Sequence, residues 1–153
     1  MRSKEDYMDY ATGAYLRYCS VGCPTRAEYE LRIRADVNNR MRLLEPRLIV
    51  MRADAAVRAS EPILKDVDAW DRTLATFAER NREEVILAVK AVYAPYEGLW
   101  RIPNKVVASR VRAFSASISA DPGTVYRWLK DARGLFAFYR ELTVDPPKFT
   151  DYL

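Results

Sequence analysis

The stretch DPGTVYRWLKDAR, residues 121–133, has the composition of a helix start. Asp121 is a residue type that favours the N-cap, and Pro122 suits the first helical position because its missing N–H has no partner there. A helix is therefore predicted from Asp121, extending as far as Arg140. Its apolar side chains recur at helical spacing and should form one core-facing surface: Val125, Trp128, Leu129 and Ala132.

A second helix is predicted directly upstream, over NKVVASRVRAFSAS, ending near Ser115 to Ser117. Val107, Val111 and Phe114 can pack on the apolar face of the following helix. The stretch SASISADPG between the two helices is longer than the usual tight turn of a helix-turn-helix. The order of helix, connection and capped helix is nevertheless typical of that motif.

The polar face of the two helices supplies candidate DNA contacts, because long basic and hydroxyl side chains can reach base edges and phosphates. The N–H groups at a helix N-terminus can also bind a phosphate. The alternative is an ordinary amphipathic helix with a solvated basic face. The predicted contacts are Thr124, Tyr126, Arg127, Lys130 and Arg133 on the second helix, with Lys105, Arg110 and Arg112 on the first as backbone contacts.

The distribution of charge supports the DNA-binding hypothesis. Residues 104–140 contain seven basic and two acidic residues, whereas residues 60–97 contain five basic and eight acidic ones. Residues 24–59 contain eight basic and five acidic residues. Arg greatly outnumbers Lys, which favours nucleic acid but equally fits a GC-rich genome. Positive charge thus concentrates on the segment that carries the candidate contacts, as expected of a nucleic-acid footprint.

The rest of the chain predicts an all-α fold, because helical periodicity is strong and no sustained alternation or hairpin turn signal occurs. Helices are expected over 6–20, 25–60, from Ser60 onward and from about Asn81 to Pro95, with Asn81 as an N-cap. Three regions follow: a helical N-terminal region over 1–80, a helix-turn-helix region over 81–142, and a tail over 143–153. The helical N-terminal region is expected to serve packing, oligomerisation or partner binding.

An apolar seam runs along residues 29–55 with spacings of three and four, as in a coiled coil or bundle helix. Pro46 falls inside it and should kink or split the helix. Packing within the chain is the preferred interpretation of the seam, and a homodimer interface is the alternative. Its members are Tyr29, Ile33, Val37, Met41, Leu44, Leu48, Met51 and Ala55.

Catalysis is not expected. The chain has no histidine, so triads and metal sites that need imidazole are excluded, and it has neither a dinucleotide-binding nor a P-loop glycine motif. The acidic pairs Asp66 with Asp68 and Glu83 with Glu84 could bind magnesium, but a solvated helix face or helix-start charge explains them better. No cofactor is expected.

Cys19 and Cys23 are the only cysteines. A single C-x3-C pair lacks two ligands for a zinc site within one chain, so two reduced, structural thiols are predicted. A four-cysteine site shared across a dimer is the alternative. The chain contains no apolar run long enough to cross a membrane and no secretion signal at its start, which predicts a cytoplasmic protein without membrane contact.

The segment from about residue 85 to 142 resembles the C-terminal part of phage late-gene transcriptional regulators of the RinA/ArpU type. It is more loosely similar to the helix-turn-helix of sigma-factor region four. The resemblance implies a phage or prophage protein that binds double-stranded DNA near a late promoter and works with the host RNA polymerase. The matching residues are Ser119, Thr124, Val125, Tyr126, Arg127, Trp128, Leu129, Lys130, Ala132, Arg133, Leu135 and Phe136.

Two other classes of function remain open. One is a DNA-packaging accessory protein like a small terminase subunit, which also uses helix-turn-helix units but assembles into rings. The other is a phage-encoded inhibitor of a host factor that acts through the seam of residues 29–55.

Overall fold

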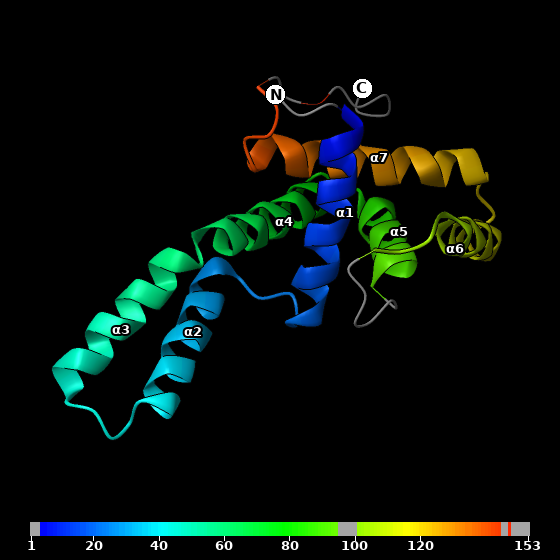
Figure 1. Ribbon diagram of the computed structural model, residues 1–153. Helices are drawn as coiled ribbons and strands as arrows, with labels where there is room; N and C mark the ends of the chain where they lie inside the picture. The colour runs from blue at the N-terminus through cyan, green and yellow to red at the C-terminus, as the bar shows by residue number, and fades with distance from the viewer. Residues whose placement is uncertain (1–3, 95–100, 145–146, 148–153) are drawn as a thin grey trace.

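The computed structural model describes residues 4–94, 101–144 and 147. This part of the chain is helical, which confirms the all-α fold (Figure 1). Most of the predicted tail, residues 143–153, lies outside the described residues. The helices are α1 (Lys4–Ser20), α2 (Arg26–Arg40), α3 (Pro46–Ala59), α4 (Glu61–Glu79), α5 (Glu83–Tyr93), α6 (Asn104–Ser117) and α7 (Pro122–Tyr139).

Four of these helices are followed, within two residues of their last helical residue, by a residue with left-handed backbone conformation. These residues are Gly22 after α1, Asn81 after α4, Ser119 after α6 and Glu141 after α7. After α4, the Arg82 N–H donates to the Phe77 carbonyl at 2.8 Å and the Asn81 N–H donates to the Ala78 carbonyl at 3.2 Å. These two bonds form a Schellman motif, which satisfies carbonyls at the end of a helix. The prediction that Asn81 caps the next helix was therefore wrong, since Asn81 terminates α4 and Arg82 precedes α5.

The core contains a group of aromatic side chains from α1, α4, α5 and α7. Trp70 lies at its centre: its ring stacks on Phe136 with centroids 4.8 Å apart and meets Tyr15 edge-on at 4.7 Å. Its indole N–H donates to the Ala11 carbonyl at 3.1 Å. Helices α4 and α5 supply further buried residues, including Phe77 and Val89.

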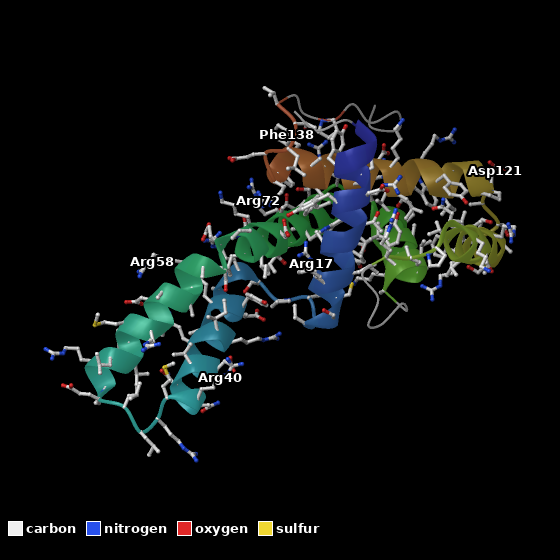
Figure 2. The ribbon with its side chains drawn as sticks, viewed as in Figure 1. Arg17, Arg40, Arg58, Arg72, Asp121 and Phe138 are labelled. Atoms are coloured by element: carbon white, nitrogen blue, oxygen red, sulfur yellow. The ribbon has the colours of Figure 1, made fainter. Side chains whose placement is uncertain are left out.

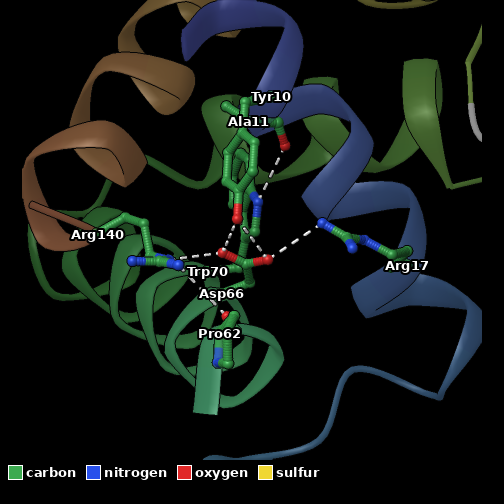
Figure 3. A network of polar contacts seen from close by, with 7 residues as sticks. All are labelled: Tyr10, Ala11, Arg17, Pro62, Asp66, Trp70 and Arg140. Carbon is green, nitrogen blue, oxygen red and sulfur yellow. Dashed lines mark hydrogen bonds and ion pairs between the residues drawn. The ribbon is translucent and has the colours of Figure 1, made fainter. Parts of the chain in front are cut away.

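A buried carboxylate joins three helices beside this core (Figure 3). Asp66 on α4 accepts hydrogen bonds from Arg140 Nε at 2.7 Å, from the Tyr10 hydroxyl at 2.8 Å and from Arg17 Nη2 at 3.1 Å. Asp66 is only 4% exposed. The prediction that it belongs to a solvated face was therefore wrong; the side chain instead ties the end of α7 and the middle of α1 to α4.

The chain between residues 25 and 60 folds back on itself as a helical hairpin that projects from the body (Figure 1). The single long helix predicted there is two helices, α2 and α3, joined by residues 41–45. Pro46 splits the pattern as expected, but it does so as the first residue of α3, where its ring is tolerated. No residue of α2 is buried, and Ala53 is the buried residue of α3.

The apolar core contains residues from both sides of residue 80. One continuous apolar cluster contains Ala11 and Tyr15 of α1, Trp70 of α4 and Phe136 of α7. The C-terminal half of α7 thus completes the core of the N-terminal helices.

Within the described residues, no helix is both long and apolar enough to span a membrane.

Candidate nucleic-acid interface

Helices α5, α6 and α7 pack against one another at one end of the molecule. In Figure 1, α6 is seen nearly end-on while α7 runs across the view, so the two helices cross steeply. The connection between them is residues 118–121, because α6 extends through Ser117 and α7 begins at Pro122. The stretch 115–123 is therefore not the long linker that the sequence suggested.

The inner face of α7 is buried as predicted. Val125 and Ala132 are fully buried and Leu129 is 1% exposed, while Trp128 is half-buried against the same cluster. Val111 of α6 is fully buried in that cluster, and Val107 and Phe114 pack against it. These contacts fix the rotation of α7 about its axis, which in turn decides which of its side chains face solvent.

The outer face of α7 presents three of the predicted contacts together. Tyr126, Arg127 and Lys130 are exposed and stand at positions i, i+1 and i+4 of the helix. Arg127 Nη2 donates to the Thr124 hydroxyl at 3.0 Å, which holds the guanidinium against the first turn. Tyr126 is 43% exposed although it is a large aromatic residue. This face combines hydrogen-bond donors with an aromatic ring open to solvent.

The N-terminus of α7 is already occupied by its own cap. The Asp121 carboxylate accepts a hydrogen bond from the Gly123 N–H at 2.9 Å, and Pro122 has no N–H to offer. The Thr124 N–H donates to the Asp121 carbonyl at 3.0 Å. A phosphate would have to displace the carboxylate to bind here, so the predicted phosphate site at this helix end is blocked in this conformation.

Two of the predicted contacts are engaged within the protein. Arg110 of α6 donates from Nη1 to the Val92 carbonyl at 3.0 Å, at the end of α5. Arg133 of α7 donates from Nη1 to the Tyr93 hydroxyl at 3.1 Å. Both arginines are part-buried, and both connect their helix to the end of α5. The structure therefore separates them from the exposed group on α7.

The remaining predicted contacts lie on α6. Lys105 and Arg112 are exposed and share one side of the helix, two turns apart. Arg101, which is also exposed, precedes α6 and lies outside the two predicted helices, so the helical pattern did not select it. Its only signal in the sequence was a positive charge next to a predicted basic helix.

The cysteines and carboxylates of the described residues form no metal-binding cluster. In the described part of the chain, no three Cys, Asp or Glu side chains come close enough to bind a metal ion together. The thiols of Cys19 and Cys23 lie 3.9 Å apart as free cysteines. Burial raises the pKa of the Cys19 thiol to about 12, so Cys19 is protonated at neutral pH.

Comparison with known proteins finds no match for the chain: no family model fits it, and no curated protein and no solved structure is significantly similar.

Proposed function

We propose that this protein binds double-stranded DNA through the exposed face of α7, in the manner of a helix-turn-helix regulator. The observation that carries the proposal is the grouping of Tyr126, Arg127 and Lys130 on the solvent face of a helix whose opposite face is buried. A recognition helix needs this division, because one side must be held rigidly while the other enters the major groove.

The surroundings of α7 support the proposal. The connection to α6 is short and the two helices cross steeply, as in a helix-turn-helix. Lys105 and Arg112 add exposed positive charge on the adjacent helix, where phosphate contacts would be made. Of the acidic residues in α6, α7 and their connection, Asp121 serves as a cap and Asp131 is half-buried.

The resemblance to phage late-gene regulators extends the proposal to a specific biological role. In that role the protein regulates prophage or phage late genes in the cytoplasm and acts together with the host RNA polymerase. A homodimer through residues 29–55 is the alternative use of the seam, in which two copies of α7 would suit a symmetric pair of half-sites. These partners and this location are part of the proposal.

The proposal is tested by measuring the affinity of the full chain for duplex DNA as a function of salt. The double substitution Arg127→Ala, Lys130→Ala should weaken binding strongly at low salt. It should also lower the slope of log Kd against log salt by about 2, because each lost phosphate contact contributes about 0.9. Both side chains are exposed, so the helix content should be unchanged.

The matched control is Lys65→Ala, Lys90→Ala, which removes the same charge from exposed positions on α4 and α5. That variant should keep most of the affinity and the salt slope. Equal losses in the two variants would show that binding depends on net charge rather than on α7. An absence of DNA binding by the wild-type chain at low salt would refute the proposal.

A further inference from the structure

Helix α3 has an apolar stripe on its exposed side. Leu48 is 42% exposed, Met51 is 61% exposed, and Ala55 is also exposed. Leu48, Met51 and Ala55 follow spacings of 3 and 4 and therefore lie along one face of the helix. Leu44, which is 41% exposed, directly precedes the helix. We call Leu44, Leu48, Met51 and Ala55 the α3 stripe.

The helical residues of the α3 stripe lie away from the most buried side of α3. Helix α3 packs on α2 through a different side, where Ala53 is buried and Ile49 and Val57 are half-buried. The α2 half of the predicted seam, from Tyr29 to Met41, is half-buried in the hairpin. The seam was predicted to pack within the chain. Among the described residues, its α2 half has such a packing partner and the α3 stripe has none.

Positive charge borders the α3 stripe on both sides. Arg52 and Arg58 are exposed, and among the described residues no carboxylate lies within ion-pair distance of either. Figure 2 shows Arg58 on the side of α3 that faces away from α2. The acidic residue of α3, Asp54, is bound to Arg34 of α2 at 2.6 Å.

The α3 stripe and the arginines on either side of it favour one kind of binding partner. An apolar stripe of about two helical turns fits the apolar face of another helix, as in helix-in-groove recognition. Flanking arginines that form no ion pair with the described residues complement acidic side chains on that helix. A second copy of α3 would bring the same arginines against each other, and DNA would leave the Leu and Met side chains unused.

We propose that the α3 stripe docks an amphipathic helix of a partner protein whose apolar face is bordered by Asp or Glu. The projection of the hairpin from the body leaves this side of α3 accessible (Figure 1). The interaction goes beyond DNA binding and does not rest on it, because α3 and the exposed face of α7 share no residue. A chain with both surfaces would connect bound DNA to the partner.

The test uses two synthetic helical peptides of about 21 residues, with Leu at heptad positions a and d. One peptide carries Glu at positions e and g, and the other carries Lys there. Each is titrated against the full chain by fluorescence anisotropy. The wild-type chain should bind the Glu peptide about ten-fold more tightly than the Lys peptide, because opposite charges across an interface determine partner choice.

Three variants locate the binding site. Leu48→Ser, Met51→Ser should weaken Glu-peptide binding about ten-fold, because the apolar anchors are lost. Arg52→Glu, Arg58→Glu should reverse the preference between the two peptides. The matched control Leu87→Ser, which changes an exposed leucine of α5, should have no effect. All these side chains are exposed, so circular dichroism should show unchanged helix content.

Other outcomes would overturn the proposal. Equal affinity for the two peptides, or binding that survives Leu48→Ser, Met51→Ser, would show that the α3 stripe is not an acidic-helix site. A dimer in sedimentation velocity that dissociates in this variant would assign the stripe to a second copy. A loss of DNA affinity in Arg52→Ala, Arg58→Ala as large as in Arg127→Ala, Lys130→Ala would assign the hairpin to DNA. Failure of DNA binding alone leaves the peptide results unaffected.

Discussion

At the scale of single residues, the end of α7 shows a local conflict between backbone and side chain. Glu141 has a φ of 65°, in the left-handed region that side chains with a Cβ disfavour. The Leu142 N–H nevertheless donates to the Ala137 carbonyl at 2.8 Å, which completes the helix end. The strain of one residue is therefore offset by hydrogen bonds that close the helix.

Glu141→Gly should raise the free energy of unfolding by about 1 kcal/mol, since glycine adopts this conformation without a Cβ clash. Glu141 is exposed, so little packing is lost. Urea denaturation measures the change. The control Ala75→Gly, at an exposed position inside α4, should lower the free energy by about 1 kcal/mol. The same sign for both variants would contradict the interpretation.

The buried thiol of Cys19 makes the protein sensitive to alkaline pH. Its pKa of about 12 in the folded chain lies above the ordinary value of 9.0, chiefly because burial disfavours the thiolate. A pKa raised by folding contributes stability that is complete below the unfolded value and is lost as pH rises through the folded value. The free energy of unfolding should therefore fall as pH rises from 9.0 toward about 12.

Cys19→Ala should flatten part of this decline, measured by urea denaturation at a series of pH values. Burial also raises the pKa of Tyr15 and of Tyr18, so part of the decline should remain. An unchanged pH profile in Cys19→Ala would contradict the assignment of this decline to the Cys19 thiol.

The exposed thiol of Cys23 should react with a thiol reagent much faster than Cys19 in the folded chain.

At the scale of helices, the cap of α7 has two opposing effects. The Asp121 carboxylate stabilises the helix start, but it also places a negative charge beside the proposed DNA-binding face. Asparagine is an equally good N-cap without the charge. Asp121→Asn should therefore separate the two effects.

In Asp121→Asn, the free energy of unfolding should change by less than about 1 kcal/mol. Affinity for duplex DNA at low salt should rise about five-fold, because a repulsive charge near phosphates is removed. Glu45→Gln, which removes the same charge from the distant hairpin, should leave DNA affinity nearly unchanged. If DNA affinity stays constant or falls in Asp121→Asn, the N-terminal end of α7 does not approach DNA.

At the scale of the whole molecule, two ion pairs with similar distances should differ in their effect on stability. Asp66 has a side chain only 6% exposed and holds Arg140 and Arg17, whereas the Asp54 side chain, 44% exposed, holds Arg34 within the hairpin. Losing one partner of a buried pair leaves uncompensated charge, while solvent screens an exposed pair.

Asp66→Ala should lower the free energy of unfolding by about 3 kcal/mol, and Asp54→Ala by less than about 1 kcal/mol. Both are measured by urea denaturation followed through tryptophan fluorescence, to which the buried Trp70 of this core contributes. Similar losses in the two variants would mean that the Asp66 network does not connect α1, α4 and α7 as the structure indicates.

The sequence by itself determined the all-α fold, the start of α7 and the buried face of α7. Caps, prolines and apolar spacing act over one to four residues, so Asp121, Pro122 and the periodicity from Val125 to Ala132 were enough to predict where α7 begins and which side is buried. The same local signals were ambiguous at Asn81, because asparagine suits both the start of one helix and the end of another.

Only the tertiary structure decided which charged and apolar side chains remain available. Arg133 bonds Tyr93, 40 residues away, and Asp66 bonds Arg140, 74 residues away. No local pattern encodes such pairings, because they depend on how helices pack and not on how each helix forms. For the same reason, the seam of residues 29–55 was visible as a pattern, but only the hairpin showed that its α2 half is covered and its α3 half is exposed.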